Sequence, residues 1–170
     1  MLTKNKSLTS TELLQRLQEI FKKSGFAIIS CGIRINNFTK FKILKNNQEY
    51  LINVNIRNIT SAYLPNKPDL MRRQVNKLNF NDIPDNTTNS ATMLLGLWDT
   101  NGNEVLAAWN PFLFIHHEKN RSCYVLKESL NKASQYGFYQ GKDSGTNILV
   151  CSENNFEKLL SVYLETYKAD

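Results

Sequence analysis

The sequence predicts an α+β domain in which a strongly curved, mostly antiparallel sheet, or an open barrel, is flanked by an N-terminal and a C-terminal helix. Two observations predict this class. Most β-type segments follow one another and are separated by short turn-forming stretches, as in antiparallel sheets. The two longest helical patterns lie near the ends of the chain, and the pattern does not alternate between strand and helix. With 170 residues, the chain has the length of a single domain spanning residues 1–170.

An N-terminal helix is predicted within residues 1–25. Thr9 and Glu12 have the spacing of a capping box, which satisfies free amide groups at a helix start. Four apolar residues then recur at helical spacing: Leu13, Leu17, Ile20 and Phe21. Ser24-Gly25 is a typical helix end. Two further helices are predicted, one at 128–136 that ends at Gly137 and one at about 154–168.

Eight strands are predicted from runs of apolar and β-branched residues bounded by turn-forming residues. They are residues 26–35, 38–45, 49–59, 71–80, 91–98, 104–109, 122–126 and 147–151. Asn36-Asn37 and Asn46-Asn47 are predicted turns, because asparagine tolerates a positive φ. The Asn-Gly pair at 101–102 indicates a hairpin between the strands at 91–98 and 104–109.

Net charge is distributed unevenly along the chain. Residues 1–80 hold 14 Lys and Arg against four Asp and Glu, whereas residues 81–170 hold seven against 11. One fold with this asymmetry has a positive face built mainly by its first half, and such a face attracts polyanions, nucleic acid first among them. A solvated basic surface without a partner is the alternative interpretation.

Motifs of common catalytic chemistries are absent or broken in the sequence. The seven glycines do not form a phosphate-binding loop, and His116 and His117 are adjacent, which suits neither a catalytic triad nor a metal site. A restriction-type nuclease needs an acidic residue followed by an acid-x-Lys pair. Asp69 and Asp85 supply the first part, but the lysine position after Glu104 holds Leu106, which cannot polarise water. No catalytic residue, metal or cofactor is therefore expected.

Two strands carry side chains of the kind that read DNA. Asn53, Asn55 and Arg57 are predicted on the polar face of their strand, while Arg72, Gln74 and Asn76 share one face of the next strand. Asn and Gln pair with adenine and Arg with guanine in the major groove. Four further cations are candidates for phosphate contacts: Lys40, Lys42, Arg73 and Lys77. A solvated sheet face is the alternative for this whole set.

Trp98 and Trp109 close the two strands of the predicted hairpin, with Tyr63 and Phe112 near in sequence. An aromatic pair of this kind is a candidate for stacking an extruded or modified base. Hairpin packing in the core is the alternative interpretation.

The chain resembles a known group of DNA-recognition modules through a series of short words: Arg72-Arg73-Gln74-Val75, Leu94-Leu95-Gly96-Leu97-Trp98-Asp99, Val105-Leu106-Ala107-Ala108-Trp109-Asn110 and Ser122-Cys123-Tyr124-Val125. These words look like the specificity domains of prokaryotic restriction systems, which resemble the plant-type pseudobarrel (B-three superfamily) DNA-binding domains. The resemblance covers about residues 71–164. It implies an open pseudobarrel at 26–170 with a C-terminal helix, and a DNA-contacting segment at Arg72-Arg73-Gln74.

The resulting hypothesis is a domain of a restriction system that binds double-stranded DNA in a sequence- or modification-specific manner. Cleavage would belong to a nuclease domain or subunit of a larger restriction protein. Two alternatives remain open, a small type II restriction endonuclease with a degenerate metal site and an RNA- or protein-interaction module. The three cysteines, Cys31, Cys123 and Cys151, offer no disulfide framework, and residues 1–10 lack a signal-peptide core. A cytoplasmic protein without a membrane partner is therefore expected, and its oligomeric state is left open.

Overall fold

The structure is a computed structural model that describes residues 7–35, 37–75, 86–100, 103–114 and 121–167. Its helices are α1 (Ser10–Lys23), α2 (Lys127–Tyr136), α3 (Phe156–Thr166) and the short 3₁₀ helix η1 (Pro111–Phe114). The first five strands are β1 (Ala27–Ile35), β2 (Phe38–Lys45), β3 (Gln48–Asn58), β4 (Thr60–Ser61) and β5 (Leu70–Val75). The remaining five are β6 (Ser90–Thr100), β7 (Asn103–Trp109), β8 (Arg121–Leu126), β9 (Phe138–Asp143) and β10 (Thr146–Ser152).

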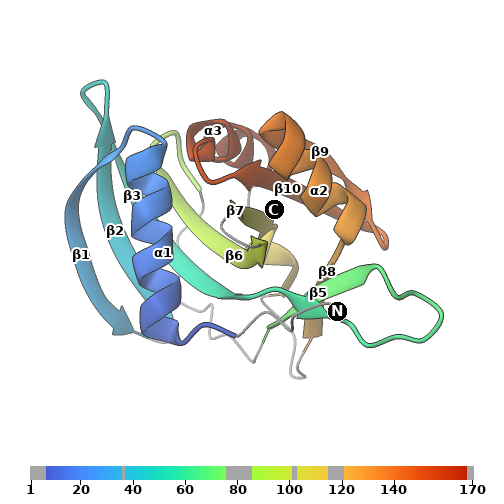
Figure 1. Cartoon of the computed structure of the whole chain (residues 1–170). Helices are drawn as coiled ribbons and strands as arrows, with labels where there is room; N and C mark the ends of the chain where they lie inside the picture. The colour runs from blue at the N-terminus through green and yellow to red at the C-terminus, as the bar shows by residue number, and fades with distance from the viewer. Residues whose placement is uncertain (1–6, 36, 76–85, 101–102, 115–120, 168–170) are drawn as a thin grey trace.

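Seven strands form one curved sheet in the order β1-β2-β3-β6-β7-β10-β9, and three form a second sheet in the order β4-β5-β8 (Figure 1). Every pair of neighbours is antiparallel except β3 and β6, which run parallel. The α+β class and the mostly antiparallel, curved sheet are thus confirmed. The large sheet is not closed into a barrel, because β1 and β9 are its edge strands.

Alternating residues of the large sheet enter two separate hydrophobic cores. On one face Ile52, Val54 and Leu95 pack with the apolar stripes of α1 and α3. On the other face Leu94 and Trp109 pack with residues of β5, β8 and α2. The large sheet is therefore the middle of three layers, with α1 and α3 on one side and the second sheet and α2 on the other.

The local predictions agree with the structure wherever hydrophobic periodicity was strong. The Thr9–Glu12 capping box is present at the start of α1, and Gly137 caps α2 with a φ of 93°. In β2, Thr39, Phe41 and Ile43 are buried, as the alternation predicts. The prediction missed β9 entirely, along with the two-residue β4 and the parallel β3–β6 pair.

Arg73 joins the two sheets and is the most deeply buried cation of the described residues. Only 1% of its surface is exposed, and its guanidinium donates to the main-chain oxygens of Asn55 (3.1 Å) on β3 and Leu95 (2.8 Å) on β6. It also donates to the Asn55 side chain at 2.7 Å and to the Gln74 carbonyl. Burial lowers the pKa of Arg73 to about 10, so the side chain stays protonated at neutral pH.

Gly96 lies on β6, on the side of the large sheet that faces β5 and β8. A Cβ atom at this position would lie 2.6 Å from Ile59 and 3.0 Å from the Trp109 ring. Glycine is therefore required for the close packing of these two side chains.

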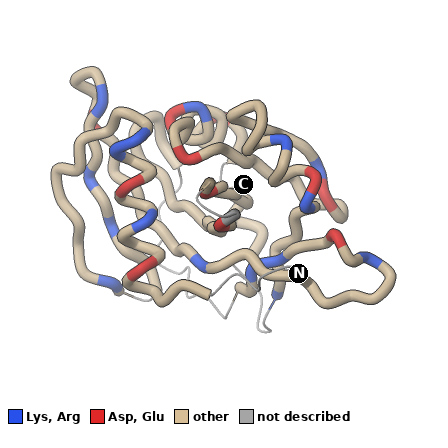
Figure 2. Tube along the Cα trace, in the orientation of Figure 1, with Lys and Arg blue, Asp and Glu red and all other residues tan. Residues whose placement is uncertain are grey.

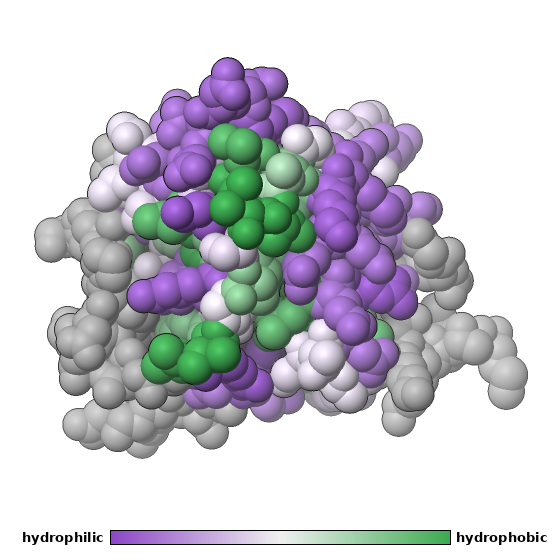
Figure 3. Space-filling model, turned by 90° about the vertical axis from the view of Figure 1, so that its left-hand side faces the viewer, coloured by the Kyte–Doolittle hydropathy of each residue, from purple (hydrophilic) through white to green (hydrophobic). Residues whose placement is uncertain are grey.

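Edge strand β1 is exposed along most of its length. Ile29, Ile33 and Ile35 keep between 50% and 79% of their surface accessible. Figure 3 shows apolar groups gathered in the middle of the face on the β1 side, between hydrophilic groups. The pairing of β1 with β2 is interrupted by two register shifts, which make the edge irregular and unfavourable for pairing with another strand.

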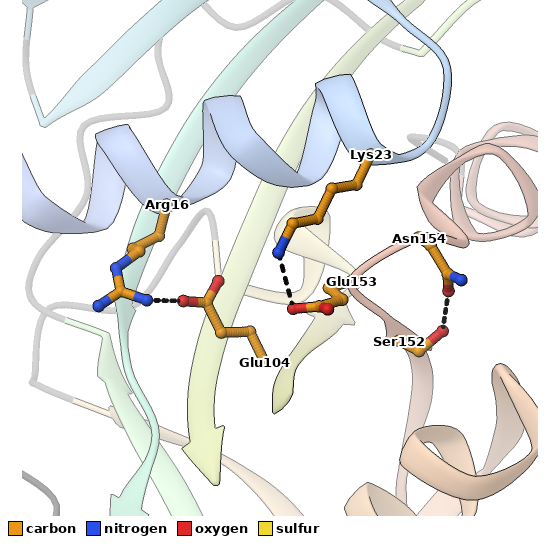
Figure 4. A network of polar contacts seen from close by, with 6 residues as sticks. All are labelled: Arg16, Lys23, Glu104, Ser152, Glu153 and Asn154. Carbon is orange, nitrogen blue, oxygen red and sulfur yellow. Dashed lines mark hydrogen bonds and ion pairs between the residues drawn. The ribbon is translucent and has the colours of Figure 1, made fainter. Parts of the chain in front are cut away.

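Two ion pairs fasten α1 to the far half of the large sheet (Figure 4). Arg16 pairs with Glu104 at the start of β7, and Lys23 pairs with Glu153 after β10 at 3.1 Å. Glu104 is 3% exposed, and its second carboxylate oxygen has no partner among the described residues. Burial therefore raises the pKa of Glu104, and the attraction of Arg16 offsets this only in part.

We predict that Arg73→Ala destabilises the protein by on the order of 3 kcal/mol, because it leaves buried carbonyl groups of β3 and β6 without donors. Urea unfolding followed by circular dichroism measures the effect. Gln74→Ala, an exposed neighbour on the same strand, is the matched control and should change stability by less than about 0.5 kcal/mol. Equal, small effects for both variants would contradict a bridging role for Arg73.

We also predict that Glu104→Gln changes how stability depends on pH. The pKa of Glu104 lies above its usual 4.5 in the folded state, so the folded protein holds this proton more tightly than the unfolded chain. The associated stabilisation is complete below pH 4.5 and is lost as the pH rises through the folded-state pKa. Urea midpoints measured from pH 4 to pH 7 should therefore shift in favour of the Gln variant as the pH rises. A shift in favour of the wild type would overturn the assignment.

Candidate nucleic-acid interface

A pocket opens where β3 extends beyond its neighbour β2. The β2–β3 pairing ends at Thr39 and Val54, whereas β3 continues beside β6 as far as Asn58. The last four residues of β3 therefore have a strand on one side only. A pocket of about 470 Å³ occupies this position, between the start of α1 on one face and the β4–β5 region on the other. We call this pocket the arginine notch.

Three arginines from three different strands line the notch: Arg34 of β1, Arg57 of β3 and Arg72 of β5. Tyr63 and Gln74 line it as well, and none of the described residues that line it is acidic. Arginine remains protonated in proteins, so the three arginines give the notch a positive charge. Guanidinium groups form strong, charge-assisted hydrogen bonds to phosphate.

The charges of Arg34 and Arg57 repel each other, which affects the pKa of Arg57. Burial lowers the pKa of Arg57, and the nearby charge of Arg34 lowers it further. Arg57 also lowers the pKa of the buried Arg73 behind the notch. Figure 2 shows Lys and Arg along β1, β2 and β3, whereas α1 and α3 carry residues of both charges. An anion in the notch would relieve this repulsion.

A chain of hydrogen bonds holds the notch in shape and starts at the buried Arg73. Arg73 donates to the side-chain oxygen of Asn55, whose amide donates to the Asn37 carbonyl at 3.0 Å. Arg34 donates to the side-chain oxygen of Asn37 at 2.9 Å and to the Ser10 hydroxyl at 3.1 Å. The contact between the two sheets thereby fixes the turn before β2 and the direction of Arg34.

Arg72 and Gln74 share one face of β5, opposite to the buried Arg73, as the sequence predicts. The β5–β8 pairing runs from Leu70 to Val75 without a bulge, so the alternation is regular. Gln74 is exposed and Arg72 is half-buried. The Nε atom of Arg72 is buried and has no hydrogen-bond partner among the described residues.

Tyr63 stands beside these side chains in an unusual backbone conformation. Its φ is +54°, in the left-handed region that a bulky residue rarely adopts, and 70% of its surface is exposed. The amide group of Tyr63 donates to the Ser61 hydroxyl at 3.1 Å, which supports the turn. Tyr63 is thus exposed at the surface and lines the same pocket as the three arginines.

The structure divides the ten predicted DNA-binding residues into groups. Arg57, Arg72 and Gln74 line the notch. Lys40 is exposed, Lys42 is half-exposed and 4.0 Å from Glu49, and Asn53 lies opposite Lys40 in the β2–β3 ladder. Asn76 and Lys77 lie outside the described residues.

Asn55 and Arg73 are corrections to that set. Asn55 is 4% exposed and Arg73 is 1% exposed, and their polar groups bond to one another and to main-chain oxygens. Asn55 lines the notch, but its side-chain amide is already bonded to Arg73 and Asn37, so the two side chains hold the sheets together. The prediction that Arg73 anchors a phosphate or a carboxylate is wrong.

Trp98 and Trp109 are not available for base stacking, which is a second correction. Trp98 is 7% exposed and Trp109 is fully buried in the core beneath β5 and β8. The indole nitrogen of Trp109 donates to the Tyr124 carbonyl at 3.0 Å. The alternative interpretation of the pair, hairpin packing, describes them correctly.

The carboxylates considered for a nuclease site are placed as follows. Glu104 is buried and paired with Arg16, and Asp69 lies on an exposed turn. Asp85, His116 and His117 lie outside the described residues. Within the described part of the chain, no cluster of three or more His, Cys, Asp or Glu could hold a metal ion. No helix in that part is long and apolar enough to span a membrane.

The sequence analysis missed Arg34 and gave Tyr63 no role in a basic site. Arg34 lies in a strand whose register shifts obscure any alternation, although its position three residues before Asn37 is a signal of contact across the turn. Tyr63 lies in a loop and carries no periodic signal. Its association with the arginines depends on how β4 and β5 pack against β3.

A family model described as methylase-associated X1 matches residues 50–160, more than half of the chain. The chain belongs to this family. The family is linked to restriction–modification systems, in agreement with the class of system that the sequence indicated. The match includes Arg57, Tyr63, Arg72 and Gln74, whereas Arg34 precedes it. The comparisons with curated proteins and with solved structures gave no match.

Proposed function

We propose that this methylase-associated X1 domain binds double-stranded DNA as the recognition part of a restriction–modification system. The observation that carries the proposal is the arginine notch, a pocket that Arg34, Arg57 and Arg72 line together with Gln74 and Tyr63. Phosphates are the anionic groups that DNA presents in a regular array, and cations that face them dominate affinity.

Basic and polar residues beside the notch extend the proposed DNA-binding surface. Lys40, Lys42 and Asn53 continue the polar face of β2 and β3. We assign the phosphate contacts to Arg34, Arg57 and the two lysines, and base contacts to Arg72 and Gln74. The pair shares one face of β5, and bidentate side chains of these types distinguish guanine and adenine.

Two simple tests would reveal the two alternative functions, DNA cleavage and RNA binding. Incubation of the protein with duplex DNA and Mg²⁺ or Mn²⁺ would reveal an endonuclease. Tighter binding of single-stranded RNA than of duplex DNA would favour an RNA-binding module.

The proposal includes a methylase or nuclease subunit as the catalytic partner and a cytoplasmic location. Site selection on random methylated and unmethylated duplexes identifies the preferred sequence.

We predict that affinity for duplex DNA falls steeply with salt. About four phosphate contacts give a slope of roughly −3.6 in a plot of log K against log salt concentration. Lys42→Ala should flatten this slope by about one unit and weaken binding to all duplexes alike. Lys158→Ala, an exposed lysine on α3, serves as the matched control and should change neither quantity. Fluorescence anisotropy titrations at four salt concentrations measure the slope, and a slope near zero would refute the proposal.

We predict that Arg72→Ala and Gln74→Ala reduce specificity more than affinity. Each should cost roughly 1–3 kcal/mol on the preferred site and little on a scrambled duplex. Paired titrations of each variant against both duplexes give the specificity ratio. If both duplexes lose affinity equally, the strand contributes charge and position but does not read bases.

A further inference from the structure

We propose that the arginine notch seats one unpaired nucleotide of DNA, with its phosphate against Arg34 and Arg57, its base on the Tyr63 ring and its base edge at Arg72 and Gln74. This inference rests on the proposed DNA binding and names the part of the DNA that enters the notch. It follows from the shape of the site, the arrangement of its charges and the placement of its aromatic ring.

The shape of the site favours a nucleotide over a phosphate of an intact duplex. The notch is a pocket of about 470 Å³ set into the gap beside the end of β3, and volumes of 300–1,000 Å³ are typical of sites that enclose whole small ligands. A phosphate of a paired strand lies on the convex surface of the duplex. It would reach the rim of the pocket and leave most of its volume to water.

Two kinds of chemistry meet in the notch. Arg34 and Arg57 are close enough for their charges to interact, and Arg34 is held in place by Asn37 and Ser10. A pair of guanidinium groups held in this way is suited to one phosphate group. The half-buried Arg72 and the exposed Gln74 come from the other wall, on β5. They supply the hydrogen bonds that a base edge needs.

The Tyr63 ring supplies a flat surface on which a base can stack. It is exposed, it lines the same pocket, and its loop is held in a conformation that costs free energy for a bulky side chain. Stacking on an aromatic ring is the usual way in which proteins bind a base that has left the helix, and it contributes about 1–3 kcal/mol per base. In a fully paired duplex both faces of each base are covered, so Tyr63 would have no base to stack on.

The test compares three DNAs of the same sequence: a paired duplex, a duplex in which one strand carries an extra unpaired nucleotide, and the single strand. The wild-type protein should bind the duplex with the unpaired nucleotide at least tenfold more tightly than the paired duplex, because the cost of unpairing has been removed. With 2-aminopurine as the unpaired base, binding should also change its fluorescence.

Variants of Tyr63 test whether its ring binds the unpaired base. Tyr63→Ala should reduce the preference for the unpaired nucleotide at least fivefold and abolish the fluorescence change, whereas Tyr63→Phe should keep both. Tyr136→Ala is the matched control, since Tyr136 is 74% exposed and lies on α2. Circular dichroism confirms that each variant is folded.

The possible outcomes separate this inference from the proposed function. If the paired duplex binds with a steep salt dependence, but the unpaired nucleotide gives no preference and Tyr63→Ala changes nothing, the nucleotide seat is refuted and DNA binding stands. If no DNA binds, both are refuted. A preference for the unpaired nucleotide that survives Tyr63→Ala would also overturn the assignment of the notch.

Discussion

The buried guanidinium of Arg73 connects the two sheets of this protein and supports the arginine notch beside them. Arg73 lies where β5 packs over the parallel pair β3 and β6. Its N–H groups donate to main-chain oxygens and to one side-chain amide oxygen. A charge with neutral partners is costly to bury, and its removal would leave the same oxygens unsatisfied. The position of β5 over the large sheet is therefore tightly specified. Through Asn55 and Asn37 the same group also fixes Arg34, so the arginine notch depends on the packing of the fold behind it.

Local patterns were sufficient to predict most of the elements but not how they assemble. The capping box of α1 and the alternation in β2 carry strong signals, because each follows from contacts between residues that are near in sequence. The β3–β6 pair depends on a connection that leaves the large sheet, forms β4 and β5 and returns. The described residues of this crossover, 59–75 and 86–89, contain no helix, and the sequence pattern predicts none there, so nothing in the pattern indicates a parallel pair. β9 was missed because it is a polar edge strand that contains Gly141 and lacks a clear alternation.

The candidate site shows the same division between local and non-local information. That Arg72 and Gln74 lie on one face of β5 and Arg73 on the other follows from strand alternation alone, and the structure confirms it. Which of the two faces meets solvent does not follow, because it is decided by the second sheet. For that reason Asn55 and Arg73, which have the same residue types as a DNA-reading set, are structural. Trp98 and Trp109 are structural for the same reason, since both lie on the face of the large sheet that the second sheet and α2 cover.

The notch exists because three constraints meet at the end of β3. β2 begins only after the turn that Asn37 forms with a φ of 69°, so that among the described residues the last four residues of β3 have no strand on this side. β5 is drawn onto the opposite side by Arg73, which brings Arg72 and Gln74 to the same gap. Filling the gap with apolar side chains would have stabilised the fold, yet the sequence places three arginines there, and the charge of Arg34 adds to the burial that lowers the pKa of Arg57. Arginine side chains gathered in one pocket with an exposed tyrosine are suited to a phosphate and a base, and this combination is the basis of our proposal that the notch receives a nucleotide.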